Sequence, residues 1–310
     1  LFTMEFTVIG ASGTTSTVDI TGAPLSVEIA DQDLNVIDVN INQGQVNSQD
    51  LIQFSGRIAA MNHSPIEGAI IKVAGDQNQT VNSMADGSYS MSLLPNGHVN
   101  LSVEKTNDTN PNNGVSTLDI ALIRRDILQM LPLQNNYQYV AADVNASSDL
   151  TTIDIALIRQ VVLGMKSSFD QGLWRFISNF TDPANPFSFQ QSYDLSPGQD
   201  QTGLDFTAVR LGDINGNWDA ANGRLKSPQQ VEFHLDEMIV RKESNFTIPL
   251  RVSDFKDISG YQFTIQWNTQ LLDFQGLTQM ALEGSFNLEN TSQGLITTSW
   301  DHETGTSTSL

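Results

Sequence analysis

The side chains best suited to chemistry in this sequence are Asp and Asn residues at alternate positions, just before two copies of one helix-forming segment. Residues 117–128 recur, mostly unchanged, as residues 152–163. Carboxylate and amide oxygens are the ligands that calcium prefers, and this hard cation needs about six to eight oxygens around one point. The repeat therefore predicts two loops that each wrap a calcium ion and lead into a helix.

The spacing of these oxygens agrees with a calcium loop whose positions 1, 3, 5, 7, 9 and 12 supply the ligands. Both copies fit this register when Asp119 and Asp154 occupy position 12. Position 6, normally glycine, is Asn113 in one copy and Ser148 in the other, so a residue with a side chain must make the sharp turn. The predicted ligands are Asp108, Asn110, Asn112, Gly114, Ser116 and Asp119 in the first loop, and Asp143, Asn145, Ser147, Asp149, Thr151 and Asp154 in the second.

Two simpler explanations exist for the same residues. Ser116 with Asp119, and Thr151 with Asp154, fit helix capping boxes, whose side chains satisfy free amides at a helix start. Asp and Asn are also ordinary turn formers. Capping accounts for the last ligands of each loop but not for the Asp and Asn at its first positions, so we favour calcium over both alternatives.

A third segment rich in Asp and Asn, residues 213–219, begins like the two loops. Its position 12 is Arg224, which cannot bind a cation. A turn, or ligands donated to a neighbouring site, explain this segment as well as a third calcium site does. Its weaker candidate ligands are Asp213, Asn215, Asn217 and Asp219.

The helices after the loops carry an apolar stripe with helical spacing, which includes Leu118 in the first copy and Ile153 in the second. Arg124 and Arg159 fall at equivalent places in the two copies. Such a stripe is most often part of a core, and we favour that interpretation over a face that binds another protein.

The composition limits the classes of partner. The chain has 310 residues, 39 % hydrophobic content and a formal net charge of -20, which fits folded domains and argues against nucleic acid or anionic membranes as partners. It has no cysteine, so disulfides and thiolate metal sites are excluded, and calcium is a common substitute staple in secreted proteins. Because no apolar run approaches the roughly 20 residues of a membrane helix, we expect no membrane insertion.

Alternation of apolar and polar residues predicts strands on both sides of the loops. We expect a mainly β chain of several β-sandwiches with a small α-helical calcium module. The expected parts are residues 1–47, 51–105, 106–222 and 229–310.

The calcium segment resembles a known family. Four of its segments are similar, in the same order, to dockerin-like modules of type I. They are the first loop with its helix start, residues 141–145 with the second helix, Trp174 with the next two residues, and the closing residues 212–217. This resemblance covers residues 107–218. It implies calcium at the two duplicated loops.

The strand-rich parts resemble two further families. Residues 56–58, 68–73 and 85–90 are similar to the carboxypeptidase-regulatory-like, or transthyretin-like, β-sandwich, which usually serves as a structural spacer. Residues 229–310 resemble the first two thirds of a cohesin-like β-sandwich, and residues 1–47 resemble its last third. The combination is similar to secreted multidomain surface proteins of Bacteroidota, and it implies one unit of a tandem array that is cut in the middle of a domain.

Each part of the divided sandwich would expose an unpaired strand edge. Residues 1–47 are therefore predicted to complete the sheet that residues 229–310 of the preceding unit begin. The units could be covalently linked or could donate strands between chains. Closure within one chain is the other possibility.

The sequence contains no recognisable catalytic arrangement, because its four histidines are scattered and no nucleophile elbow or phosphate loop is present. We predict that the chain is not an enzyme. It is expected to be a calcium-stabilised structural repeat of an extracellular filament or large surface adhesin, with neighbouring copies of itself as partners. The alternatives are a dockerin/cohesin-type binding module that assembles a polysaccharide-degrading complex, or an accessory region of a secreted hydrolase.

Overall fold

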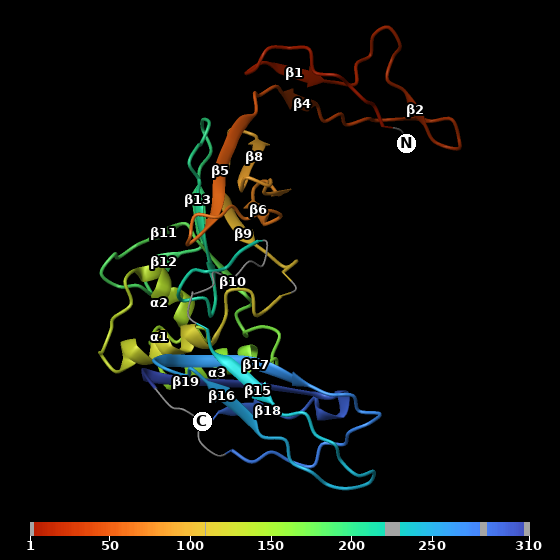
Figure 1. Ribbon diagram of the computed structural model, residues 1–310. Coiled ribbons are helices and arrows are strands. Elements are labelled where there is room, and N and C mark those ends of the chain that lie inside the picture. The colour runs from red at the N-terminus through yellow and green to blue at the C-terminus, as the bar shows by residue number, and fades with distance from the viewer. Residues whose placement is uncertain (1–2, 109, 221–229, 280–283, 307–310) are drawn as a thin grey trace.

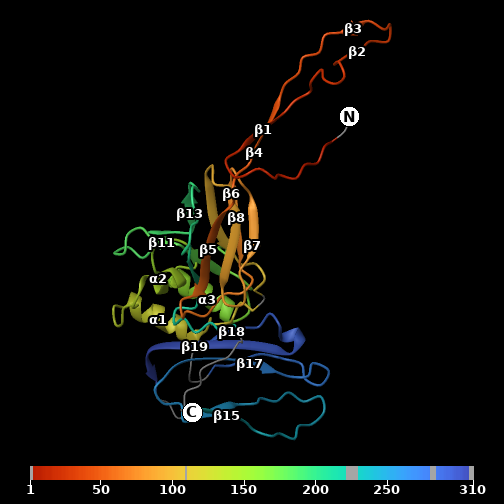
Figure 2. The same ribbon diagram turned by 90° about the horizontal axis from the view of Figure 1, so that it is seen from above.

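The computed structural model describes residues 3–108, 110–220, 230–279 and 284–306. This part of the chain is mainly β, and its three α-helices lie between an N-terminal arm and a set of C-terminal strands (Figures 1 and 2). None of the helices in these ranges is long and apolar enough to cross a membrane.

The N-terminal arm, residues 3–47, projects away from the rest of the chain (Figure 2). Alternation predicts a strand over residues 2–8, but the described residues 3–8 form none, and side chains such as Phe6 and Val8 are exposed. The arm therefore has a strand-like sequence without a sheet to join. Its described strands pair with one another, β1 (Thr15–Val18) with β4 (Gly44–Asn47) and β2 (Ile29–Ala30) with β3 (Val36–Ile37).

The middle of the chain forms two four-stranded sheets that share one hydrophobic core. We call this pair of sheets the spacer. Phe54, Ile71 and Leu101 are buried in this core, because alternate residues of each strand face the opposite sheet. The strand orders are β10-β14-β5-β8 and β13-β9-β6-β7. The strands are β5 (Ile52–Ala60), β6 (Ile70–Gly75), β7 (Gln79–Asn82), β8 (Ser88–Leu93), β9 (Val99–Glu104), β10 (Trp174–Ile177), β13 (Ser192–Leu195) and β14 (Phe206–Arg210).

Three strands of the spacer come from the segment that the sequence assigns to the calcium module. β14 runs parallel to β5, β10 runs antiparallel to β14, and β13 extends the other sheet beside β9. The expected boundary between residues 51–105 and 106–222 therefore does not separate two structural units. β10 has all four residues buried, so it lacks the alternation that would have revealed it as part of a sheet.

The helices pack beside the spacer, and α1 and α3 contact each other. Ile120 and Ile155 occupy equivalent places in their shared core. Leu118 and Ile153, which we expected in the buried stripe, are exposed, so the buried stripe is displaced around each helix. The helices are α1 (Thr117–Ile127), α2 (Asn136–Ala142) and α3 (Thr152–Val162), and a small sheet of β11 (Asn179–Phe180) and β12 (Phe189–Gln190) lies near α2.

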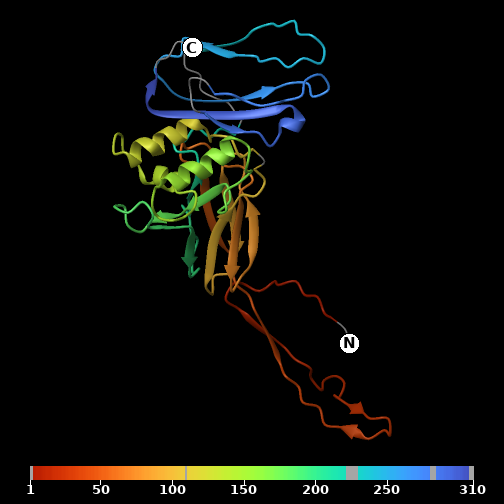
Figure 3. The same ribbon diagram turned by 90° about the horizontal axis from the view of Figure 1, so that it is seen from below.

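The C-terminal sheets, residues 230–279 and 284–306, lie across α1 and α3 (Figure 3). Phe255, Tyr261 and Trp300 pack together in their small core. The strand orders are β15-β16 and β17-β19-β18. The elements are β15 (Glu232–Leu235), β16 (Leu250–Ser253), β17 (Ile258–Gln266), β18 (Ser285–Asn287), the 3-10 helix η1 (Thr291–Gln293) and β19 (Leu295–Thr306).

The arm and the C-terminal sheets lie at opposite ends of the molecule, with the spacer and helices between them (Figures 2 and 3). Within the described ranges, no strand of the arm pairs with a strand of the C-terminal sheets. Closure within one chain, which the sequence left open, is therefore not the arrangement in this structure.

Candidate metal centre

The second predicted loop, residues 143–154, folds around the carboxylate of Asp143. The backbone N–H groups of Ser147 and Ser148 donate to its Oδ1 and Oδ2 at 2.9 and 3.0 Å, and Ser147 also donates to Oδ1 of Asn145 at 2.9 Å. Ser148, at position 6, has a φ of 60°, the left-handed conformation that glycine adopts more readily. The sharp turn is therefore made without glycine, as the sequence requires.

Asp154 closes this loop from the first turn of α3. Its Oδ2 accepts hydrogen bonds from the N–H and the hydroxyl of Thr151 at 3.0 and 3.1 Å, which is the predicted capping box. Its Oδ1 is buried and has no partner of hydrogen-bond geometry among the described residues. Burial raises the pKa of Asp154, and the charge of Asp143 raises it further. Capping therefore accounts for one carboxylate oxygen, and the backbone N–H of Asn145 is a further group near this carboxylate that lowers its pKa.

The third segment repeats the arrangement of the second loop. The N–H of Asn217 donates to Oδ1 of Asp213 and to Oδ1 of Asn215, both at 3.0 Å, and the N–H of Trp218 donates to Oδ2 of Asp213 at 2.9 Å. These bonds match those around Asp143 one for one. Residues 213–218 thus repeat the hydrogen-bond pattern of residues 143–148.

Asp119, at the start of α1, completes this half-loop from a distant part of the chain. Its Oδ1 accepts from the N–H groups of Ile214 and Asn215 at 2.8 and 3.1 Å, while its Oδ2 accepts from the N–H and hydroxyl of Ser116, both at 2.9 Å. Asp119 and Asp213 are 0 % and 1 % exposed. Two carboxylates from distant segments therefore share one buried site.

The two segments also meet beside Gly114. A Cβ on Gly114, whose φ is 81°, would lie 2.8 Å from Oδ2 of Asp213, so only glycine fits this close approach. The amide of Asn113 donates to the carbonyl of Asp219 at 2.8 Å. Residues 213–219 therefore lie beside residues 113–119. They take the place that the first half of the predicted loop over residues 108–119 would have.

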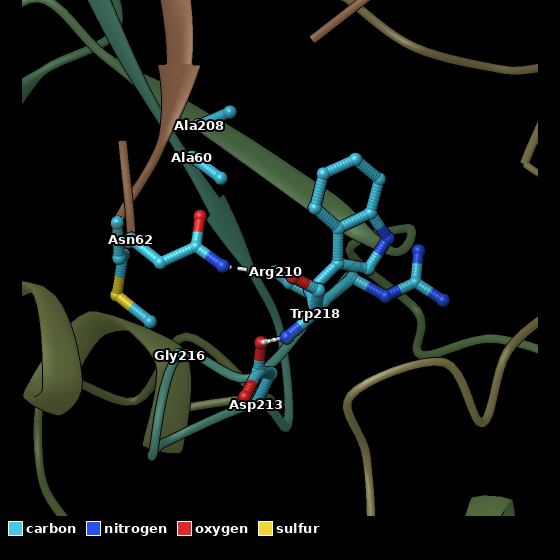
Figure 4. A pocket seen from close by; sticks show the side chains of 8 residues that line it. Ala60, Asn62, Ala208, Arg210, Asp213, Gly216 and Trp218 are labelled. Atoms are coloured by element: carbon cyan, nitrogen blue, oxygen red, sulfur yellow. Dashed lines mark hydrogen bonds between the residues drawn. The ribbon is translucent and has the colours of Figure 1, made fainter. Parts of the chain in front are cut away.

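Asp108, the predicted first ligand of the continuous loop, is engaged elsewhere. Its Oδ2 forms an ion pair with Nη1 of Arg210 at 2.7 Å and accepts from the indole N–H of Trp174 at 2.9 Å. Arg210 also donates to the carbonyl of Asn110 at 2.7 Å and is 1 % exposed. The first half of the predicted loop thus neutralises a buried guanidinium. Figure 4 shows Arg210 near Trp218 and Asp213, with the bond from the Trp218 amide to Asp213 dashed.

The donor sets fit a hard cation, and Oδ1 of Asp154 and Oδ1 of Asn112 are buried oxygens of predicted ligands that have no hydrogen-bond partner among the described residues. In the part of the chain that the structure describes, no three His, Cys, Asp or Glu side chains gather in one group, so amide, hydroxyl and main-chain oxygens would complete each shell. One set keeps the predicted residues Asp143, Asn145, Ser147, Asp149, Thr151 and Asp154. The other combines Asp213, Asn215 and Asn217 with Gly114, Ser116 and Asp119, and leaves out Asp108, Asn110 and Asn112.

The metal-free chain is expected to lose stability as the pH rises from about 4 to about 7. Burial and the nearby charge of Asp213 raise the pKa of Asp119 to about 7, and burial raises that of Asp213 to about 6, so the folded state holds protons that the unfolded chain has released. Urea unfolding in chelator at about pH 5 and pH 7.5 measures this trend. Greater stability at the higher pH would contradict it, and an Asp119→Asn variant should flatten it.

Comparisons with known proteins identify no family for the chain. No family model matches it, and no curated protein matches it. A solved structure, the TIE protein of Bacillus anthracis, is similar over 30 % of this chain and 19 % of its own length, with 12 % identity and a TM-score of 0.18. The chain thus spans about a fifth of that protein.

Proposed function

We propose that this chain is a non-catalytic, calcium-stabilised structural unit of an extracellular filament or large surface adhesin. Successive units join head to tail when the arm of one completes the C-terminal sheets of the preceding unit as a split, cohesin-like β-sandwich. The observation that carries this proposal is that the arm and the C-terminal sheets lie at opposite ends of the chain and that, within the described residues, neither pairs with the other or with the spacer's sheets.

The arm has the properties of a donated segment. It exposes apolar side chains along its whole length, and a soluble chain rarely leaves so many apolar groups in water without a partner. Residues 3–47 carry Asp and Glu but neither Lys nor Arg, and the chain as a whole has a net charge of -20, so burial of apolar surface rather than charge attraction would hold the arm in place. The exposed side chains include Met4, Phe6, Val8, Ile9, Ile20, Leu25, Ile29, Leu34, Val36 and Val46.

The C-terminal sheets have the properties of an acceptor. Their described strands form sheets of two and three members, and the buried core between them is small. Residues 271–279 form no strand, and Leu271 is 79 % exposed. Other exposed apolar side chains are Phe233, Leu235, Ile239, Phe246, Ile248, Leu250, Leu272 and Leu288. Added strands would bury these groups and pair the free edges.

Calcium would serve the unit as a staple. Asp119 and Asp154 begin α1 and α3, which support the C-terminal sheets, and a cation at each would neutralise the buried carboxylates. The donor set that includes both Asp213 and Asp119 also connects residues 213–219, which follow β14, to α1. Binding in the range of roughly 10⁻⁴ to 10⁻³ M, as in extracellular modules, suffices for this role.

The experiment that tests this function is electron microscopy of the full chain in calcium, with light scattering in parallel. Filaments with a regular axial repeat are expected, and their mass should rise with protein concentration. Isolated monomers at every concentration would count against head-to-tail assembly. Calcium-dependent 1:1 binding to a separate cohesin-like protein would instead favour the alternative, a binding module of a polysaccharide-degrading complex.

A further inference from the structure

The three-stranded sheet has one aromatic face and one polar face. Tyr261 and Trp300 lie on the aromatic face, while their neighbours along the strands point the opposite way. The polar face of an antiparallel sheet normally meets water. Here it is covered, since Asn287 and Ser299 are 2 % and 1 % exposed. This burial of polar groups marks a specific contact surface.

The surface that covers the polar face belongs to α1 and α3. Thr117 donates its N–H to Oε1 of Gln262 at 2.8 Å, and Arg125 donates to the hydroxyl of Ser259 at 3.0 Å. After α3, the carbonyl of Leu163 accepts from the amide of Asn287 at 3.2 Å. The helices therefore satisfy polar groups of the sheet along both β17 and β18.

The centre of this contact is a carboxylate held by two arginines. Nη2 of Arg124 lies 2.8 Å from Oδ2 of Asp301, and Nη2 of Arg159 pairs with Oδ1 of the same side chain. The Asp301 side chain is 2 % exposed. Arg124 and Arg159 are equivalent residues of the internal repeat, so the duplicated helices direct two guanidinium groups to one carboxylate.

We propose that the α1/α3 face is a dedicated interface for the polar face of this chain's own sheet, closed by Arg124 and Arg159 on Asp301. The face is therefore not free for a separate protein. The clamp also leaves the strand edges of the C-terminal sheets open to the next unit. Its dependence on calcium rests on the proposed function, because Asp119 and Asp154 lie on the helices that carry the two arginines.

The internal repeat supplies a matched pair of probes for this interface. Thr117 and Thr152 are equivalent, but Thr117 is 3 % exposed beneath the sheet and Thr152 is exposed. Thiol labelling of Thr117→Cys and Thr152→Cys in the full chain, which has no other cysteine, measures access to each. Thr117→Cys is expected to react at least about 10-fold more slowly, because local undocking must precede its labelling.

Asp301→Asn is expected to raise the labelling rate of Thr117→Cys about 10-fold or more, since it leaves two partly buried guanidinium groups without a charged partner. The rate of Thr152→Cys should not change, which together with circular dichroism shows that the fold is retained. Asp273→Asn, an exposed acid of the same sheets, should alter neither rate.

Equal labelling of the two thiols in calcium would overturn the proposal, because the face would then be open in solution. Protection of Thr117→Cys that persists with Asp301→Asn would overturn the clamp. Protection lost both with Asp301→Asn and on chelation supports the clamp and its coupling to calcium. Protection that survives chelation but is lost with Asp301→Asn supports the clamp and counts against calcium as the staple of the proposed function.

Discussion

Removal of residues 1–47 is expected to abolish filament formation and to leave a folded monomer. The hydrophobic core of the spacer contains no residue of the arm, so its stability should be nearly unchanged. The free edges of the C-terminal sheets would lose the segment that we propose pairs with them. Sedimentation velocity of the truncated and full-length chains in calcium measures the outcome.

Point substitutions in the arm test the same prediction without a deletion. Phe6 and Val8 lie on one side of the predicted strand, whereas Thr3 and Thr7 lie on the other. Phe6→Asp with Val8→Asp should weaken assembly about 100-fold or more, since each apolar side chain contributes about 1.5–3 kcal/mol when it is buried. Thr3→Asp with Thr7→Asp is the matched control. Equal assembly of both double variants, or filaments from the truncated chain, would show that the arm is not the donated segment.

The second large effect concerns calcium. The full chain is expected to bind two calcium ions, and Asp154→Ala or Asp213→Ala should each leave one. At calcium concentrations about 100 times the dissociation constant, each site adds about 2.7 kcal/mol to the free energy of unfolding, so chelation should lower the melting temperature by several degrees. Isothermal titration calorimetry gives the stoichiometry, and thermal unfolding gives the stability.

A substitution of Asp108 distinguishes two possible calcium sites. One is the continuous loop over residues 108–119 that the sequence predicts, and the other is the combined site of residues 213–217 with residues 114–119. If residues 213–217 supply the first half of the site, Asp108→Asn should retain two calcium ions. It should still destabilise the chain by about 3–5 kcal/mol, because buried Arg210 loses its charged partner. Loss of one ion in Asp108→Asn, with two ions retained in Asp213→Ala, would restore the continuous loop.

Local sequence was enough to predict the parts of the centre that depend on neighbouring residues. The capping boxes of Ser116 with Asp119 and Thr151 with Asp154 are present, and α1 and α3 begin where the repeat places them. The turn at residues 143–148 also follows from nearby Asp and Asn residues. These contacts span at most a few positions, so spacing alone specifies them.

The rest of the centre depends on contacts between distant segments, which spacing cannot reveal. Asp108 pairs with Arg210, and Asp119 meets residues 214–215, although roughly a hundred positions separate the members of each pair. Arg210 is buried with no other carboxylate in ion-pair contact among the described residues, so its need for a counter-charge decides the position of Asp108. Arg224, which argued against a third loop, lies outside the described residues.

The polar face of the three-stranded sheet shows the same limit. Clean alternation in β17 predicts a sheet with one face in water, and the residue types agree. That face instead packs on helices, because Arg124 and Arg159 pair with Asp301 and Thr117 donates to Gln262. A polar residue type thus reveals which way a side chain points, but not whether water or another part of the chain meets it.

The most direct test of the split sandwich is hydrogen exchange of the full chain in calcium, below and above the concentration at which filaments form. We expect amides of residues 3–47 and of strands β15 to β18 to gain protection together, by about 10-fold or more, when filaments form. Filaments in which the arm still exchanges at the rate of an unpaired segment would contradict the account.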